Sequence, residues 1–255
     1  MPLYRTEGIC LRSYELKEAD RIVVLLTRDQ GKVRAVAKGV RRPGSRLAGS
    51  LLPFTHSRLL LHRGRELDKV VQCEAVFGFR ALREELERMA AASYLAELAD
   101  GFLGEKDPNA GLFPSFLASL HLLAGHPDLR HALVLVQGLL LASLGYRPEL
   151  DICVHCGADL EEGREAVVYH PGEGGVLCGR CGSERKGRGT MTISRGAWQT
   201  LRRLWATDPG RLTMLRPGKA VRGEMETLLR ATMIHRLERR PKTLDFLDLV
   251  LRESE

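Results

Sequence analysis

The sequence predicts an α+β protein of several domains, in which a small barrel of strands precedes a helical domain with a metal-binding insert. Three observations lead to this architecture. The first 80 residues contain five short β-rich segments with no room for helices between them. From Phe79 onward, apolar residues recur with the period of a helix. Near the middle of the chain, four cysteines form two closely spaced pairs.

The five N-terminal segments have the apolar alternation and the β-branched content of strands. They cover residues 5–12, 20–27, 32–39, 57–63 and 67–76. Compact turns at 29–32 and 63–66 join the second segment to the third and the fourth to the fifth. Five strands in so short a stretch predict a small antiparallel barrel, and an OB-fold is the obvious candidate. We place this domain at residues 1–78.

Helical periodicity predicts three helices before the cysteine pairs. The first begins near Phe79, the second covers 112–124 and the third covers 128–144, with Asp128 placed to cap its start. The apolar residues expected on one side of the first helix are Leu82, Leu86, Met89, Leu95, Leu98 and Phe102. The apolar stretch 132–146 is too short to span a bilayer and predicts a buried core helix. This first part of the helical domain covers 79–150.

The helical domain is expected to resume at 191–255. Ser194 is placed to cap a helix that reaches about Ala206. A last long helix at 222–239 ends before Pro241. Its apolar stripe, which we interpret as core packing, consists of Leu228, Leu229, Met233, Ile234 and Leu237.

The cysteine pairs are the most specific motif of the chain. They are Cys153-Val-His-Cys156 and Cys178-Gly-Arg-Cys181, with residues 157–177 between them. Cysteines at this spacing in two facing turns form a tetrahedral thiolate cage for Zn²⁺. A short hairpin is expected between the pairs, from strands at 166–169 and 176–177. We therefore predict a zinc ribbon at 151–190 that holds one structural Zn²⁺.

Other uses of these cysteines are less favoured. Disulfides need an oxidising compartment, and the first residues lack the apolar core of a signal peptide. A redox dithiol uses one pair, and a catalytic zinc keeps an open position that four thiolates close. A deaminase would need an HxE motif, which the chain lacks around His170 and His235. His155 and His170 could each replace a cysteine, but exposed positions suit both better. A cytoplasmic protein with reduced cysteines is expected.

Charge is concentrated at the N-terminus. The formal net charge of the chain is +7, and residues 1–80 contain sixteen Lys and Arg against eight Asp and Glu. In the third strand, Val33, Ala35 and Ala37 alternate with cations, so the two sets should face the core and the outside. The loop 39–46 continues the basic stretch, and Asp29 is the single acid between 28 and 46. The residues predicted to contact nucleic acid are Lys32, Arg34, Lys38, Arg41, Arg42 and Arg46.

Aromatic residues are sparse, and Tyr4, Tyr14 and Phe54 are the N-terminal candidates for base stacking, although a core role is commoner for such rings. Phosphate contacts should therefore dominate, with steep salt dependence and little sequence preference. Two other function classes stay open. One is a zinc-ribbon adaptor that binds RNA, for example on the ribosome. The other is a nuclease, for which no suitable carboxylate grouping stands out. The least specific alternative is a basic surface that binds no partner and only keeps the protein in solution.

The chain resembles the RecO family of bacterial DNA repair and recombination mediators along nearly its whole length. The resemblance is sharpest at Ala37-Lys-Gly-Val-Arg-Arg42 with Ser45-Arg46. Further matching pieces, in order, are Glu7–Arg12, Glu18–Val24, Gly31-Lys32, Tyr94–Leu98, Leu112-Phe113, Leu144-Gly-Tyr146 and the four cysteines. The family combines an N-terminal OB-fold, a helical domain and an inserted zinc ribbon, in agreement with the pattern of strands, helices and cysteines.

The resemblance implies a protein without catalytic residues that binds single- and double-stranded DNA and anneals complementary strands. It also implies a partner, RecR, with which the family helps to load the RecA recombinase onto DNA coated by single-stranded-DNA-binding protein. Some members bind the tail of that coating protein through cations before the Leu-Gly-Tyr motif. The corresponding stretch here, 134–138, has no cations, and Arg130 and His131 are the nearest substitutes. The implied location is the cytoplasm, in association with the nucleoid, with no membrane or small-molecule partner.

Overall fold

The computed structural model describes residues 2–160, 166–185, 187 and 189–253. Its chain forms two compact units, one made of 1–126 with 241–255 and the other of 127–240. No helix among these residues is long and apolar enough to cross a membrane. The four domain boundaries expected from the sequence remain predictions.

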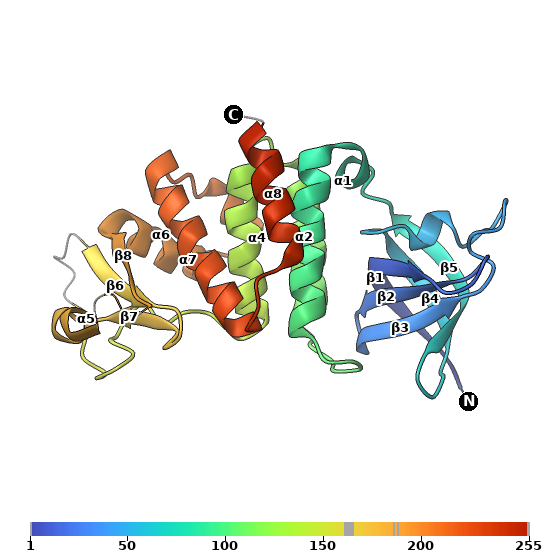
Figure 1. The fold of residues 1–255 in the computed structure, drawn as a ribbon, viewed down its shortest axis with the longest axis horizontal. Helices are drawn as coiled ribbons and strands as arrows, with labels where there is room; N and C mark the ends of the chain where they lie inside the picture. The colour runs from blue at the N-terminus through green and yellow to red at the C-terminus, as the bar shows by residue number, and fades with distance from the viewer. Residues whose placement is uncertain (1, 161–165, 186, 188, 254–255) are drawn as a thin grey trace. The chain divides into compact units, whose positions relative to one another are not determined.

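The first unit begins with a closed barrel of five strands (Figure 1). The strands are β1 (Leu3–Glu15), β2 (Arg21–Thr27), β3 (Gly31–Ala37), β4 (His56–His62) and β5 (Asp68–Phe77). They follow one another around the barrel in the order β1-β2-β3-β5-β4, and only the β3–β5 pair is parallel. This is the topology of an OB-fold, which confirms the barrel predicted from the sequence.

Strand register decides which side chains fill the barrel. Val23 pairs with Ala35 and Leu25 pairs with Val33, and these residues belong to the buried core inside the barrel. The alternate pairs, Val24 with Arg34 and Leu26 with Lys32, therefore point outward, because paired residues share a face. Val24 and Leu26 are nevertheless only 1% exposed. The outer face of β2 is thus covered by other parts of the protein.

Four helices complete the first unit: α1 (Ala81–Glu84), α2 (Leu86–Phe102), α3 (Leu112–Gly125) and α8 (Lys242–Glu253). The single helix expected after Phe79 is broken at Glu85, whose backbone is extended, and Leu86 is exposed rather than part of the core. Helix α8 was missed because Pro241 was interpreted as an end. Glu97 of α2 accepts hydrogen bonds from the backbone N–H of Lys242 and Thr243 and so caps α8 from another helix.

The second unit contains α4 (Leu129–Ser143), α5 (Gly179–Arg185), α6 (Arg195–Ala206) and α7 (Lys219–Leu237). Asp128 caps α4 through the His131 N–H at 2.9 Å, and Ser194 caps α6 through the Ala197 N–H at 3.2 Å, as the sequence predicts. The buried apolar face of α4 is also confirmed.

A three-stranded sheet of order β7-β6-β8 lies between α4 and α6 in the sequence. Strands β6 (Ala166–His170) and β7 (Gly175–Leu177) form the expected hairpin, and the third strand, β8 (Met191–Ser194), was not expected. Short 3₁₀ turns at Gly49–Leu51 and Pro209–Met214 complete the secondary structure.

Replacement of Gly31 by alanine tests how the barrel joins the segment after α2. Gly31 has φ +63°, and an added Cβ would lie 2.0 Å from the carbonyl oxygen of Asp107. Gly44 has a similar φ of +74° but nothing within 4 Å of such a Cβ. Gly44→Ala should therefore cost only the left-handed backbone strain, about 1 kcal/mol. Gly31→Ala should lower the Tm distinctly more, and equal shifts in thermal unfolding would contradict the contact.

Candidate nucleic-acid interface and metal centre

The cations of β3 alternate with core residues as predicted, but they are not free. Lys32 Nζ lies 3.2 Å from the Asp100 carboxylate and donates a hydrogen bond of 2.6 Å to the Asp100 carbonyl oxygen. The Lys32 side chain is 13% exposed. Asp100 also pairs with Arg12 of β1 at 2.5 Å. The end of α2 is thereby attached to the outer face of the barrel.

The segment after α2 extends this contact along β3. The backbone N–H of Lys106 donates to the Lys32 carbonyl oxygen at 2.8 Å, and Glu105 forms a parallel bridge with Lys32. Arg34 Nη1 pairs with the Glu105 carboxylate at 3.0 Å, although its side chain is 41% exposed. Lys106 Nζ lies 3.3 Å from the buried Asp68 carboxylate. A short stretch of chain therefore pairs with β3 and brings the Glu105 carboxylate to Arg34.

The single acid between 28 and 46 indicated that these cations lack balancing carboxylates, which is wrong for Lys32, Arg34 and Arg41. The local count of acids between 28 and 46 missed Asp100 and Glu105, which come from more than 60 residues further along the chain. It also missed Glu15, which pairs with Arg41 at 3.1 Å. Only folding of the whole first unit, with α2 against the barrel, brings these groups together.

The loop 38–46 carries the remaining predicted cations. Lys38, Arg41, Arg42 and Arg46 are all exposed. Within the described part of the chain, no ion pair engages Lys38, Arg42 or Arg46. In this loop, positive charge therefore faces solvent without a carboxylate partner among the described residues.

The backbone of this loop is anchored to the turn between β1 and β2. The Gly39 N–H donates to the Asp20 carboxylate at 2.8 Å, and the Arg41 N–H donates to the Ala19 carbonyl oxygen at 3.1 Å. Val40 is 6% exposed and belongs to the barrel core. The turn between the first two strands is one of the loops with which OB-folds bind oligonucleotides. The cations of loop 38–46 lie beside it.

The three aromatic candidates have different environments. Phe54 is buried, which confirms the core alternative for this ring. The Tyr4 hydroxyl donates to the Asp68 carboxylate, and burial together with this carboxylate raises the Tyr4 pKa. Tyr14 is exposed, with the Arg12 guanidinium 4.7 Å from its ring centroid. Tyr14 is thus the one of the three that could stack on a base.

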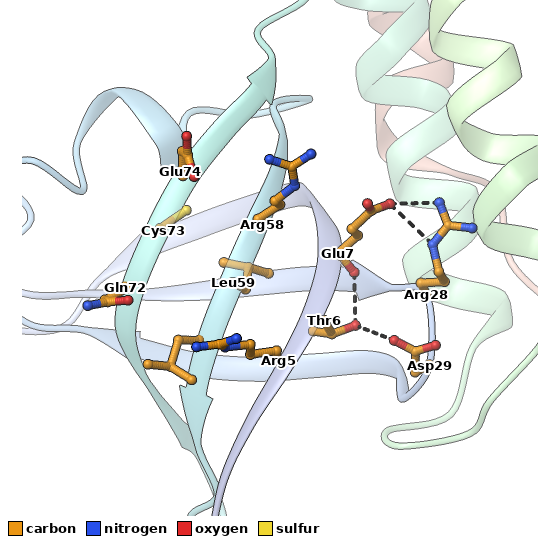
Figure 2. A pocket seen from close by; sticks show the side chains of 11 residues that line it. Arg5, Thr6, Glu7, Arg28, Asp29, Arg58, Leu59, Gln72, Cys73 and Glu74 are labelled. Atoms are coloured by element: carbon orange, nitrogen blue, oxygen red, sulfur yellow. Dashed lines mark hydrogen bonds and ion pairs between the residues drawn. The ribbon is translucent and has the colours of Figure 1, made fainter.

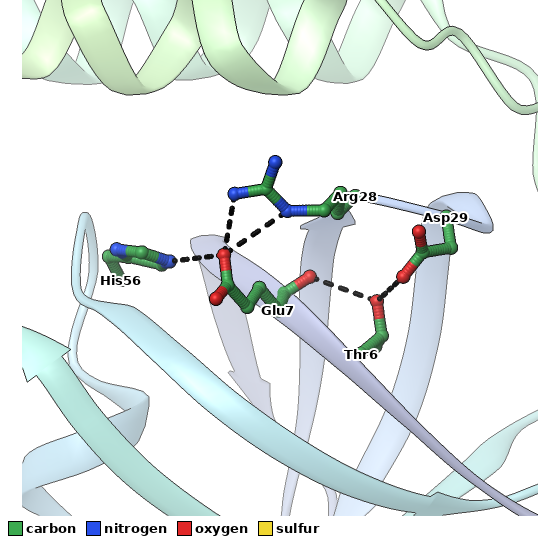
Figure 3. Close-up of polar contacts among 5 residues, drawn as sticks. All are labelled: Thr6, Glu7, Arg28, Asp29 and His56. Carbon is green, nitrogen blue, oxygen red and sulfur yellow. Dashed lines mark hydrogen bonds and ion pairs between the residues drawn. The ribbon is translucent and has the colours of Figure 1, made fainter.

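The outer face of β1, β4 and β5 has a hollow of about 680 Å³ that the sequence did not indicate (Figure 2). At its edge, Arg28 binds the Glu7 carboxylate at 2.6 Å, and Thr6 donates to Asp29 at 2.9 Å (Figure 3). The hydrogen bond from Arg28 lowers the Glu7 pKa. Arginines and carboxylates are balanced here, as the lining residues show: Arg5, Thr6, Glu7, Arg28, Asp29, Arg58, Leu59, Leu60, Gln72, Cys73 and Glu74. The balanced charge of this hollow therefore gives it no preference for a polyanion.

The four predicted metal ligands meet in the second unit. One Sγ each from Cys153, Cys156, Cys178 and Cys181 lies within 4.8 Å of the others, and Cys156 and Cys178 are 3.7 Å apart. Four sulfurs around a zinc ion at 2.3 Å would be about 3.8 Å apart, so the cluster has the right size for a tetrahedral ion. The four cysteines therefore form a cluster that could bind a metal ion.

Tight turns place the sulfurs. Gly157 has φ +72° and donates its N–H to the Cys153 carbonyl oxygen at 2.8 Å, which closes the first turn. The Gly182 N–H makes the same 2.8 Å bond to the Cys178 carbonyl oxygen at the start of α5. Burial raises the Cys153 pKa, but N–H donors from the two turns outweigh burial and lower it to about 6. The cluster therefore favours thiolate at Cys153, the form that binds metal.

The two nearby histidines lie outside the cluster. His155 Nδ1 is 3.0 Å from the Arg185 guanidinium, which also pairs with Glu173 at 3.1 Å. His170 Nδ1 accepts a hydrogen bond from the Glu173 N–H at 3.1 Å. Both histidines make other contacts, and the choice of cysteine over histidine ligands stays a prediction.

Comparisons with known proteins agree with the barrel, the helices and the cysteines. The family model described as Recombination protein O N terminal matches residues 1–79, and Recombination protein O C terminal matches 83–245. The chain belongs to the RecO family. A relative named DNA repair protein RecO, from Symbiobacterium thermophilum, is 43% identical over 97% of this chain and 98% of the relative. Another of that name, from Desulforamulus reducens, is 35% identical over 100% of this chain and 97% of the relative.

Loss of one cysteine tests the metal centre. Cys153→Ser should release the metal and lower the Tm, because a structural ion contributes its binding free energy to folding. Cys73→Ser is the matched control, since Cys73 lies in the barrel outside the cluster. Metal content per chain is measured by atomic emission on both variants. A Cys153→Ser protein that keeps its metal and its Tm would show that the cage is assigned wrongly.

Proposed function

We propose that this RecO-family protein is a DNA repair and recombination mediator that binds single- and double-stranded DNA through its barrel without sequence preference. The observation that carries the proposal is the set of exposed loop cations Lys38, Arg42 and Arg46, which have no carboxylate partner within the described residues. They stand beside the β1–β2 turn of an OB-fold. Guanidinium and ammonium groups in such a position attract phosphates and displace counterions.

The six predicted DNA contacts then divide by accessibility. Arg34 and Arg41 are exposed enough to exchange Glu105 and Glu15 for a phosphate, because surface ion pairs contribute only about 0–1 kcal/mol. Lys32 is largely buried with Asp100, and removal of one member of such a pair costs about 3–5 kcal/mol. We therefore assign Lys32 to holding the barrel and α2 together, next to the DNA surface.

Annealing requires no catalytic residues. Two complementary strands repel each other through their phosphates, and a cationic surface lowers this repulsion by counterion release. Base pairing then supplies the driving force. The four-cysteine cluster is proposed to hold one Zn²⁺, which is structural because four thiolates leave no open coordination position.

The family membership supports the partners of the proposed activity. With RecR, the protein would help load the RecA recombinase onto DNA coated by single-stranded-DNA-binding protein, in the cytoplasm at the nucleoid. A contact with the tail of that coating protein would use Arg130, because His131 is buried. Preference for RNA over single-stranded DNA in a filter-binding competition would favour the adaptor alternative instead.

Removal of the loop cations tests the DNA surface. Arg42→Ala with Arg46→Ala should weaken binding about equally for all single-stranded sequences and reduce the salt slope by about 0.7 for each lost phosphate contact. Arg252→Ala is the control, since Arg252 is exposed on α8 and forms no ion pair with a described residue. Fluorescence anisotropy of labelled oligonucleotides measures both quantities. A loss confined to one sequence would contradict backbone recognition.

Annealing of complementary strands tests the activity itself. The wild-type protein should accelerate annealing of bare strands, and with RecR it should also accelerate annealing of coated strands. The Arg42→Ala, Arg46→Ala protein should be slower in both assays, while Lys32→Ala should mainly lower the Tm. Annealing rates are followed by fluorescence quenching between end-labelled strands. No acceleration by the metal-loaded wild-type protein would exclude the proposed activity.

A further inference from the structure

The segment between α2 and α3 lies on strand β3, next to the loop cations that are proposed to bind DNA. Residues 104–108 of this segment are all exposed, and we name them the acidic strap. Buried Leu103 precedes the strap, and after it the Asn109 side chain accepts a hydrogen bond of 3.1 Å from the Leu112 N–H. Both ends of the strap are thus fixed at helices, while its middle contacts the barrel.

Polar contacts join the strap to the barrel. The Lys106 N–H donates to the Lys32 carbonyl oxygen at 2.8 Å, and the Lys106 ammonium lies 3.3 Å from the Asp68 carboxylate. Between them, the Glu105 carboxylate pairs with Arg34 at 3.0 Å. The strap therefore places a negative charge on a cation of β3 that belongs to the predicted DNA contacts.

These contacts can open without unfolding the barrel. The Arg34 and Glu105 side chains are 41% and 46% exposed, and ion pairs this exposed contribute little to stability. When the strap leaves, the buried Asp68 carboxylate still accepts hydrogen bonds from the Tyr4 hydroxyl and the Gly64 N–H. The buried charge therefore keeps partners, and the penalty for an uncompensated buried charge does not arise.

Asp100 provides a contrast within the same unit. Its side chain is only 14% exposed and contacts both Lys32 and Arg12. Because Asp100 belongs to α2, it cannot leave without moving the helix. The cations on the outer face of the barrel are thus covered in two ways, by a fixed carboxylate at Lys32 and by a displaceable one at Arg34.

Glu105 occupies the place that a phosphate would take against Arg34. A carboxylate and a phosphate accept hydrogen bonds from the same fork of N–H donors on arginine. Lys38, the first cation of the loop, follows shortly after Arg34 in the chain. A nucleic-acid strand that binds the loop and continues along β3 therefore meets the Glu105 carboxylate.

We propose that the acidic strap is an autoinhibitory contact, in which Glu105 holds Arg34 until a nucleic-acid phosphate displaces it. The inference rests on the proposed DNA binding and adds how access to that surface is controlled. Glu105 is part of the same chain as Arg34, so its effective concentration there is high. A free phosphate ion competes poorly against such a partner.

A bound strand competes much better. Once Lys38, Arg42 and Arg46 hold its backbone, the next phosphate also acts at a high effective concentration. Binding is then ordered, with the loop first and Arg34 second. The strap thereby favours long polyanions over small anions, because only a strand that already contacts the loop can displace Glu105.

The test removes the charge of Glu105 from the full-length, metal-loaded protein. Glu105→Gln keeps the shape of the side chain but no longer neutralises Arg34. Glu66→Gln is the matched control, because Glu66 is exposed between β4 and β5 and forms no ion pair with a described residue. Fluorescence anisotropy gives the Kd of a labelled oligothymidylate of about 16 nucleotides, the upper end of what one OB-fold covers. We expect Glu105→Gln to bind about two- to fivefold more tightly, the factor that corresponds to an exposed ion pair.

A second variant shows whether the gain passes through Arg34. In an Arg34→Gln protein, the further change Glu105→Gln should leave the Kd unchanged, because the guanidinium that it would release is absent. Arg34→Gln should also weaken binding more in the Glu105→Gln protein than in the wild type. The reason is that the wild-type arginine must first give up its carboxylate partner.

Failure of this inference differs from failure of the proposed function. If the wild type binds and Glu105→Gln binds equally or more weakly, the autoinhibitory contact is overturned and the barrel surface stands. If neither protein binds, both proposals are overturned. An equal gain in Glu66→Gln would reduce the effect to overall charge, and a gain that persists without Arg34 would show that Glu105 acts elsewhere. Either of these results refutes the contact.

Discussion

The Asp100 carboxylate near the end of α2 contacts two cations of the barrel, Arg12 at 2.5 Å and Lys32 at 3.2 Å. Around this contact, the outward-facing Val24 and Leu26 are buried on the outer face of β2. An OB-fold commonly binds its ligand on the face of strands 2 and 3. Here much of that face is used inside the first unit, so the proposed DNA contact lies at its margin, where loop 38–46 begins.

The position of that loop follows from the same constraint. Val40 in the barrel core and the Gly39 N–H bond to Asp20 hold the loop against the β1–β2 turn. The cations can therefore project into solvent from a backbone that is already ordered. A preformed set of cations loses less conformational entropy on binding than a free chain would. For the proposed DNA binding, this ordered loop offsets the loss of those β3 cations that are already paired with carboxylates.

Local sequence patterns predicted the parts of the fold that depend on residues close together in the chain. Alternation in β3 identified Val33, Ala35 and Ala37 as core, and the two Cys-x-x-Cys turns identified the metal cluster, because each turn forms within four residues. Interactions between distant segments were not predictable in this way. Glu97 caps α8 across some 145 residues, and Asp100 neutralises Lys32 across 68. The spacing of Leu244, Leu247 and Val250 was the signal that could have revealed α8.

The four-cysteine cluster and helix α6 lie in the same compact unit, and a small sheet connects them. Strand β8 pairs with β6 and ends at Ser194, which caps α6. The hairpin that follows the first cysteine pair therefore leads through β8 directly into this helix. Because a structural metal contributes its binding free energy to folding, the proposed ion would stabilise the sheet from which α6 begins. Such an ion would support the second unit without taking part in any chemistry.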